Sequence, residues 1–150
     1  MLERRIARLV TIGTAFELVP LLLALPAVAF PELAPLDPVI LERAIVGYAA
    51  LCLAFLGGVR WGIGLCAGDG TNAVYLLGAL GPALGLAALL FPFGPALSLL
   101  TVGFAAQGAW DAWSGHRKTV PDAYARQRIG ATLATCLVLI VILFARAAHG

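Results

Sequence analysis

The residues that could do buried polar chemistry in this sequence are one arginine and two acids inside long apolar stretches. Arg60 lies in the run Phe55–Gly62, Glu17 lies in the first apolar stretch and Asp111 lies in the fourth. Placing an arginine at the centre of a membrane helix costs roughly 2.5–3.5 kcal/mol on insertion scales, so such a residue is usually paired, hydrated or functional. Because a guanidinium can bind one carboxylate or be shared by two, we expect Arg60 to pair with Asp111, with Glu17 or with both.

A fourth polar residue extends this predicted cluster. Gln107 precedes Asp111 by one helical turn, so the two lie on the same face. With both acids ionised, the cluster of Arg60, Asp111, Glu17 and Gln107 carries one net negative charge, and one acid can then hold a proton at neutral pH. Three interpretations stay open: a structural tie between helices, a path for protons, ions or a lipid or quinone headgroup, and contact with a buried polar group of a partner.

The elements that must position these residues are membrane helices. The chain has 150 residues, of which 61% are hydrophobic and 12% are charged, and its mean hydropathy is +0.96. Soluble domains carry about 25% charged residues, so this composition predicts an integral membrane protein. The length leaves room for five spans and short loops but for no soluble domain. The few basic residues are those that membrane orientation requires, so we expect no nucleic-acid partner.

The predicted fold is one all-α transmembrane domain over residues 1–150. A crossing helix needs about 20 apolar residues, and the five predicted spans are about 10–30, 42–66, 71–91, 96–113 and 127–146. Asp37 followed by Pro38 predicts the start of the second helix, as a cap and a first-turn proline. Pro20 predicts a bend in the first helix. The amino-terminal stretch is similar to a signal peptide, but its long apolar run contains Glu17 and Pro20, so we expect a retained span.

The distribution of lysine and arginine predicts the orientation of the five spans. With an odd number of spans, seven basic residues share one side and only Arg43 and Arg146 lie on the other. Because cytoplasmic loops carry the excess of basic residues, we expect a cytoplasmic amino terminus and a periplasmic carboxy terminus in the bacterial inner membrane. On this orientation the predicted polar cluster lies in the inner half of the bilayer. The seven residues are Arg4, Arg5, Arg8, Arg117, Lys118, Arg126 and Arg128.

Small residues predict how the helices pack. The second span carries a ridge of small residues spaced by four from Ala50 to Cys66, which lets another helix backbone approach closely. We expect this ridge to pack within the chain, against spans three and four, and a helix of another subunit is the alternative. The predicted packing residues are Ala54, Gly57, Gly58, Gly62, Gly78, Gly81 and Gly85.

Aromatic and basic residues near the predicted cytoplasmic boundary indicate contacts with lipid headgroups. Tryptophan and tyrosine form belts at membrane interfaces, and basic loops attract anionic headgroups. The predicted interfacial residues are Trp61, Trp110, Trp113, Arg117, Lys118, Tyr124, Arg126 and Arg128.

Residues for catalysis or metal binding are not arranged in any recognisable motif. Three cysteines match no metal or redox spacing, and neither histidine has a plausible serine partner. We therefore expect no enzymatic activity, no cofactor and no metal.

The run from Tyr48 to Gly62 is similar to the signature of the transmembrane-protein-69-like family, a bacterial and mitochondrial domain of unknown function. In that family a tyrosine begins the segment and a Phe-x-Gly-Gly-x-(Arg or His)-Trp-Gly run ends it. Asp111 matches its acidic residue late in the fourth span. A Pro-x-x-Tyr-x-x-x-Arg-x-x-x-Thr pattern entering the last helix is matched by Pro121, Tyr124, Arg128 and Thr132.

The resemblance covers nearly the whole chain, with some departures. Ala49, Ala54 and Ala123 stand where glycine, serine and tryptophan are usual, and Glu17 falls in a region that is mostly apolar in the family. The resemblance implies a small multi-pass protein of the bacterial inner membrane, related to mitochondrial inner-membrane proteins. It implies no activity. The alternation of Arg and His at the position of Arg60 suits a polar contact better than a strict bidentate clamp.

The leading functional prediction is a non-enzymatic accessory or assembly subunit that packs against a larger, energy-transducing membrane complex. The alternative is a small oligomeric carrier, or a protein that binds a lipid or quinone headgroup at the polar cluster. A carrier of this size would need oligomers, because 150 residues are too few for two transporter repeats. The expected partners are the lipid bilayer, other membrane subunits and such a headgroup.

Overall fold

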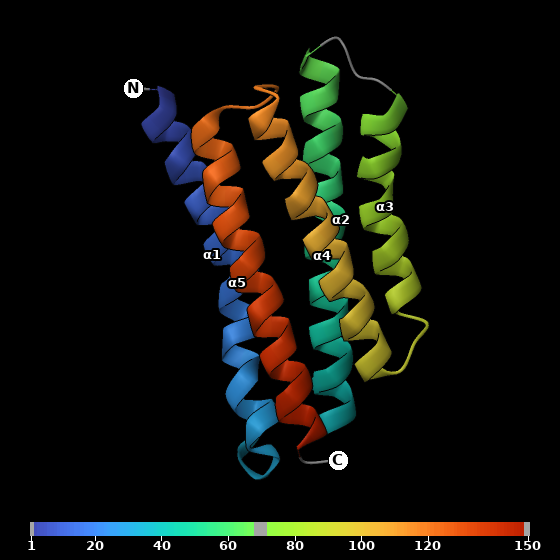
Figure 1. The fold of residues 1–150 in the computed structure, drawn as a ribbon. Coiled ribbons are helices and arrows are strands. Elements are labelled where there is room, and N and C mark those ends of the chain that lie inside the picture. The colour runs from blue at the N-terminus through green and yellow to red at the C-terminus, as the bar shows by residue number, and fades with distance from the viewer. Residues whose placement is uncertain (1, 68–71, 149–150) are drawn as a thin grey trace. The chain divides into compact units, whose positions relative to one another are not determined.

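The computed structural model describes the backbone of residues 2–67 and 72–148. Within these ranges the chain forms five α-helices, one short 3-10 helix and no strand, which confirms the all-α prediction (Figure 1). The predicted start of the third span, residue 71, lies outside the described residues, as do the side chains of Arg4 and Arg5. The elements are α1 (Leu2–Ala29), η1 (Pro31–Leu33), α2 (Pro38–Ala67), α3 (Asn72–Ala88), α4 (Phe93–His116) and α5 (Asp122–Ala147).

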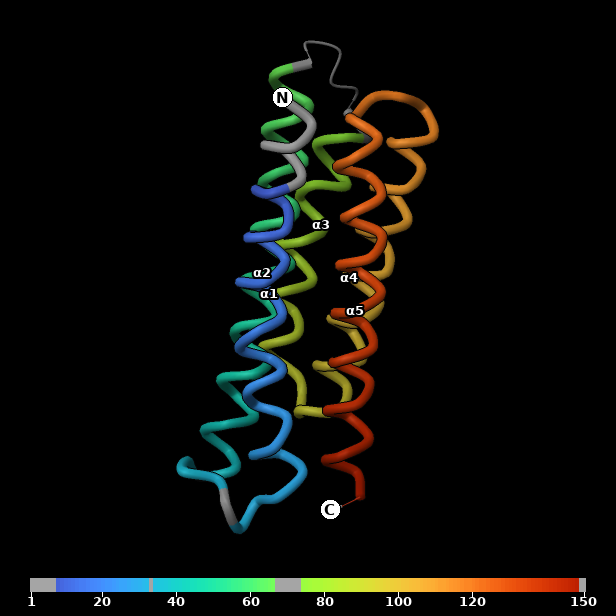
Figure 2. The backbone as a smooth tube through the Cα atoms, turned by 90° about the vertical axis from the view of Figure 1, so that its left-hand side faces the viewer, coloured from blue at the N-terminus to red at the C-terminus, as the bar shows by residue number. Residues whose placement is uncertain are grey.

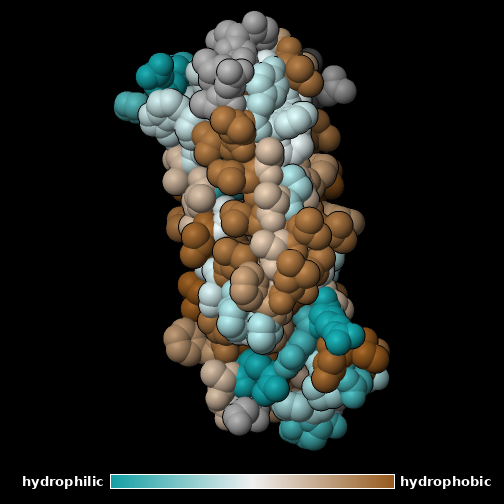
Figure 3. Space-filling view, turned by 90° about the vertical axis from the view of Figure 1, so that its right-hand side faces the viewer, coloured by the Kyte–Doolittle hydropathy of each residue, from teal (hydrophilic) through white to brown (hydrophobic). Residues whose placement is uncertain are grey.

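Three of these helices are long and apolar enough to cross a membrane. They cover Arg8–Ala29, Pro38–Cys66 and Asp122–Ala147, and Val74–Ala88 is a shorter apolar helix. Hydrophobic side chains cover much of the face shown in Figure 3. These features support a membrane protein, while the count of five spans and the orientation stay predictions.

The start of α2 is capped as predicted. The Asp37 Oδ1 atom accepts hydrogen bonds from the backbone N–H groups of Val39 at 2.9 Å and of Ile40 at 3.4 Å. These two groups have no carbonyl partner within the helix, so the carboxylate satisfies them and α2 begins at Pro38. In α1 the helix continues through Pro20 to Ala29. The bend at Pro20 stays a prediction.

The chain divides into two compact units, each with its own helix packing. One unit comprises residues 1–35 with 104–150, and the other comprises residues 36–103. In the first unit α1 and α5 lie side by side (Figures 1 and 2). Buried apolar side chains of this unit include Leu21, Val28, Phe104, Ala131, Leu139 and Ile142.

Glycines bring the end of α4 close to α5 in this first unit. A Cβ atom built on Gly108 would meet the side chain of Thr132, and one on Gly115 would meet the Cβ of Ala125. Any larger residue at these two positions would have to push the helices apart. The close approach therefore depends on two glycines spaced by seven residues.

The second unit contains α2, α3 and the first part of α4, with α2 and α3 as neighbours (Figure 1). Gly57 approaches the backbone of Gly78, and a Cβ on Gly85 would lie 2.9 Å from the carbonyl oxygen of Ala50. Gly64 approaches Val74, where the corresponding Cβ distance is 3.0 Å. The contact positions of α2 are therefore spaced by seven, as in helix pairs with interlocking side chains. Buried apolar residues here include Ile45, Ala49, Leu53, Ala96, Leu97 and Leu100.

The predicted ridge with a spacing of four contacts α3 at Ala50, but its two glycines do not contact α3. Gly58 and Gly62 are exposed, and a Cβ on either would meet nothing within 4 Å. A spacing of four advances by roughly 40° at each step, so the ridge winds around α2, whereas a spacing of seven drifts by only about 20° and stays on one face. Of the predicted packing residues, Gly57, Gly78, Gly81 and Gly85 are buried and Ala54 is half-buried.

Candidate functional site

Three charged side chains meet in the interior of the first unit. Arg128 of α5 lies between Glu17 of α1 and Asp111 of α4: its Nη1 is 3.3 Å from Glu17 Oε2 and its Nε is 3.5 Å from Asp111 Oδ2. Each of the three residues is no more than 5% exposed. One buried guanidinium is therefore shared by two buried carboxylates from two other helices.

A threonine completes the hydrogen bonding of Glu17. Thr135 is fully buried, and its Oγ1 donates a hydrogen bond of 2.7 Å to Glu17 Oε1. The Glu17 carboxylate thus accepts one hydrogen bond from Thr135 on one oxygen and one from Arg128 on the other. Hydrogen bonds to a charged acceptor are about twice as strong as neutral ones, so this arrangement holds α1 against α5.

The periodicity of α5 explains why these donors face the same acid. Arg128, Thr132 and Thr135 follow one another at spacings of four and three, so they share one face of the helix. All three are buried in a helix whose remaining surface is largely apolar. This polar stripe is directed toward the helices that carry the two acids.

Gly108 allows Asp111 to reach the cluster. Gly108 lies one turn before Asp111 on α4, at the point where α4 comes closest to Thr132 of α5. Because α4 has no side chain at this contact, its backbone can approach α5 and the short Asp111 side chain can contact Arg128.

Two polar atoms of the cluster have no hydrogen-bond partner among the described residues. They are Arg128 Nη2 and Thr132 Oγ1, both buried and one turn apart on α5. A buried donor without a partner is unfavourable by about 1–3 kcal/mol, so such groups usually mark a site for water, an ion or another ligand. An oxygen atom of a ligand could accept a hydrogen bond from each of these two groups.

The charges of the cluster do not balance within this unit. One guanidinium faces two carboxylates, which leaves one net negative charge when both acids are ionised. Removing one partner from a buried ion pair leaves an uncompensated charge, which is strongly destabilising. The arrangement can therefore tie three helices together, and its two unpartnered donors can bind a polar group.

The structure places the residues of the predicted cluster in two different units. Glu17, Asp111 and Gln107 are buried in the first unit, and Gln107 is 7% exposed. Arg60 is also buried, at 7% exposed, but belongs to the second unit. The pairing of Arg60 with Asp111 or Glu17 stays a prediction.

Arg128 differs from its predicted environment. It was expected among the headgroup contacts of a basic patch, but it is 4% exposed and contacts two buried acids. Counting charges along the sequence assigns every arginine near a helix end to the interface, whereas Arg128 lies six residues inside α5. The signal that could have identified it is the polar stripe that it forms with Thr132 and Thr135.

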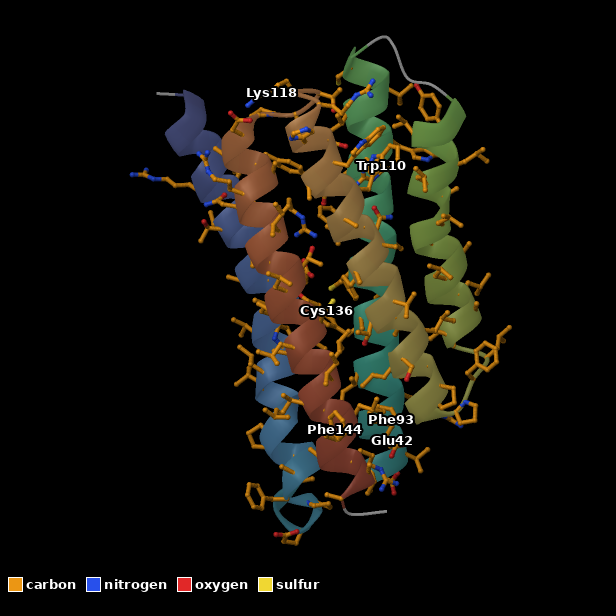
Figure 4. All side chains as sticks on the ribbon, in the orientation of Figure 1. Glu42, Phe93, Trp110, Lys118, Cys136 and Phe144 are labelled. Atoms are coloured by element: carbon orange, nitrogen blue, oxygen red, sulfur yellow. The ribbon has the colours of Figure 1, made fainter. Side chains whose placement is uncertain are left out.

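Several other predicted interfacial residues gather around the connection between α4 and α5. The rings of Trp110 and Trp113 are 4.6 Å apart, and the guanidinium of Arg117 lies 5.1 Å from the centre of the Trp113 ring. Lys118 Nζ lies 2.8 Å from both carboxylate oxygens of Asp122 (Figure 4). Tyr124 is half-buried and Arg126 is exposed.

Trp61 makes its contacts within the second unit. Its Nε1 donates a hydrogen bond of 2.7 Å to the carbonyl of Tyr75, and the two rings meet edge to face at 5.7 Å. The side chain is 45% exposed. Trp61 is therefore both an exposed aromatic residue and a contact between α2 and α3.

In the part of the chain that the structure describes, no group of three or more His, Cys, Asp or Glu residues could hold a metal ion. None of the three cysteines forms a disulfide; Cys66 is exposed, and Cys52 and Cys136 are half-buried.

Comparison with known proteins gives a family but no activity. No curated protein matches the chain, and no solved structure matches it. The model of one family, described as a protein of unknown function (DUF3429), matches residues 6–144. Nothing in this match carries the transmembrane-protein-69-like name, so that resemblance stays an expectation. The match includes all three charged residues of the buried cluster, and the chain belongs to the DUF3429 family of proteins of unknown function.

Proposed function

We propose that this chain is a non-enzymatic accessory or assembly subunit that packs against a larger membrane complex. It crosses the bacterial inner membrane five times, with its amino terminus in the cytoplasm and its carboxy terminus in the periplasm. Its partners are the lipid bilayer and other membrane subunits, and nucleic acid is not among them. The resemblance to mitochondrial inner-membrane proteins directs the proposal toward energy-transducing complexes.

The observation that carries the proposal is that α2 has two small-residue faces and only one of them is occupied. Ala50, Gly57 and Gly64 contact α3. On the other face, Gly58 and Gly62 are exposed and a Cβ on either would meet nothing within 4 Å. This chain therefore uses glycines for close helix contacts, and it leaves one glycine pair open.

The neighbours of the open glycines support a docking role. Phe55 is 68% exposed and Leu65 is 67% exposed, so the glycines form a notch between two large apolar side chains. In a bilayer, helices associate by van der Waals contact between close backbones, and glycine permits that approach. The notch suits a crossing helix of another subunit better than it suits lipid tails, which fill narrow notches poorly.

The test is to compare the assembly state of the wild-type protein with that of a variant in which the notch is filled. The double substitution Gly58→Leu and Gly62→Leu adds side chains at exposed positions where nothing lies within 4 Å of the added Cβ, so we expect the contacts of α3 to persist. We expect the wild-type chain, extracted from its native membrane in a gentle detergent, to migrate with a larger complex that the variant loses.

The matched control is Gly130→Leu on α5, where the glycine is also exposed with open space around it. The control variant should stay in the complex. Recovery of the wild-type chain only as a monomer, or equal loss of assembly in both variants, would contradict the proposal.

A second candidate function is favoured by the unpartnered donors of the buried cluster. Arg128 Nη2 and Thr132 Oγ1 could bind an oxygen of a lipid or quinone headgroup. The chain would then hold or carry such a molecule as an oligomer. This role uses the cluster for binding, whereas the docking role uses it only to tie α1, α4 and α5 together.

Thr132→Val tests this second candidate, because it removes one unpartnered donor and keeps every ion pair of the cluster. We expect less lipid or quinone to copurify with the variant, as measured by mass spectrometry of the extracted protein. Thr14→Val is the control, since the Thr14 hydroxyl bonds only the carbonyl of its own helix. Equal amounts in all three proteins would remove this candidate. If the chain acts as a carrier, Arg60→Ala should abolish flux in vesicles. Normal flux in this variant would exclude the carrier function.

A further inference from the structure

A cavity in the second unit is lined by none of the residues of the charged cluster. Its volume is about 480 Å³, within the range of small-molecule sites. It is formed by the first turns of α2 and by the connection from α3 to α4. Two of its lining residues, Glu42 and Phe93, lie close together in Figure 4. Its lining residues include Val39, Glu42, Arg43, Phe91 and Phe93.

The cavity combines an apolar wall with one exposed cation. Val39 and Phe91, both on the wall, are 53% and 54% exposed. Arg43 is exposed, and within the described ranges its guanidinium has no hydrogen bond or ion pair. A guanidinium presents a planar set of donors that matches two oxygens of a phosphate group. The lining therefore offers a phosphate contact next to an apolar surface.

The position of the cavity along α2 indicates the source of such a ligand. Arg43 lies five residues after Pro38, at the end of the apolar stretch Pro38–Cys66. In a membrane helix this is the level at which hydrocarbon gives way to headgroups. Residues after Arg43 lie deeper in the apolar stretch, so a molecule with a phosphate at Arg43 would have its apolar part beside Val46 and Leu89, which also line the cavity.

We propose that this cavity binds a phospholipid, with the lipid phosphodiester at Arg43 and the first carbons of its acyl chains against Val46 and Leu89. Glu42 also lines the cavity and makes an interaction of its own. The site is independent of both the α2 notch and the buried cluster, so it can exist whichever function is correct.

The experiment is a lipid titration of the purified full-length chain by native mass spectrometry, with dioleoyl phosphatidylethanolamine as the probe. We expect a defined one-lipid adduct with the wild-type protein. Arg43→Gln should weaken the apparent affinity about tenfold, since it removes the charge-assisted contact to phosphate. Arg8→Gln is the control, because Arg8 is an exposed arginine of the other unit and does not line the cavity.

A second variant guards against general effects of charge. Val39→Trp keeps the guanidinium but fills the cavity from an exposed position, and we expect it to lose the adduct as well. Circular dichroism and elution volume should match the wild-type protein in every variant. The proposal would be overturned if Arg43→Gln bound the lipid as tightly as the wild type, or if Arg8→Gln lost as much affinity as Arg43→Gln. It would also be overturned if Val39→Trp kept the adduct, or if soluble glycerol phosphate displaced the lipid.

Discussion

Arg128 holds the two acids of the buried cluster, and its charge has a larger energetic consequence than its packing. Its Nη1 and Nε contact carboxylates on two other helices, at 3.3 and 3.5 Å. Such a cluster contributes little when it is complete, because three charges must leave water to form it. It becomes costly when it is broken, because the two buried carboxylates then lose the guanidinium that they share.

Substitution of Arg128 by methionine keeps a long side chain and removes the charge. We expect Arg128→Met to lower the free energy of unfolding by about 3–5 kcal/mol, the usual cost of breaking a buried ion pair. In a Glu17→Gln background the same substitution should cost less, because only Asp111 would then lose its cation. Unfolding in mixed micelles of increasing sodium dodecyl sulfate measures both values, and equal costs in the two backgrounds would argue against a shared guanidinium.

The hydroxyl of Thr135 gives a smaller and cleaner test of the same site. Thr135→Val keeps the shape of the side chain and removes the 2.7 Å hydrogen bond to Glu17. We expect a loss of about 1–3 kcal/mol, because a buried acceptor loses its donor. The same substitution at Thr14, whose hydroxyl bonds the carbonyl of Val10 in its own helix, should be close to neutral. A neutral effect at Thr135 would mean that Glu17 is hydrated.

At the scale of the helices, spacing decides which small residues form contacts. Residues of α2 spaced by seven contact α3, whereas the exposed glycines belong to the ridge spaced by four. The α4–α5 contact repeats the rule with Gly108 and Gly115. Glycine content alone therefore identifies helices that pack closely, but the spacing of seven identifies the face of the helix that makes the contact.

Two neighbouring glycines of α2 test this rule directly. Gly57→Ala places a methyl group against the backbone oxygen of Gly78, which cannot move without shifting α3. We expect it to destabilise the protein by about 1–3 kcal/mol, as overpacking does. Gly58→Ala adds the same group in open space and should be neutral or stabilising, by up to about 1 kcal/mol from helix propensity. The same detergent unfolding assay compares them, and equal effects would contradict the observed register.

At the scale of the whole molecule, the prediction to be tested is the orientation in the membrane. Seven basic residues on one side against two on the other predict an amino terminus inside and a carboxy terminus outside. A carboxy-terminal alkaline phosphatase fusion should therefore be active, and a fluorescent protein fusion at the same position should be dark. The opposite pattern would exclude five spans with a cytoplasmic amino terminus.

The sequence predicted a large part of the architecture and a smaller part of the site. Hydropathy predicted a helix in each of the five regions where the described residues form an α-helix, because burial in lipid or protein requires apolar residues in nearly every turn. It did not predict the short helix η1. Asp37 predicted the start of α2 through a local hydrogen-bonding pattern, which involves only adjacent residues. Glu17 and Asp111 were recognised as buried because acids in apolar stretches are rare and conspicuous.

Tertiary structure alone decided that Arg128 meets those acids and which glycines meet a neighbouring helix. Arg128 lies near a helix end, where sequence patterns favour an interfacial position, and only the packing of α5 against α1 and α4 turns it inward. The choice between Gly57 and Gly58 likewise depends on the rotation of α2 about its axis. The inward position of Arg128 and the choice of Gly57 both depend on the angle at which the helices pack, which is a property of several helices together. The length of an apolar helix and its cap depend only on the residues of that segment.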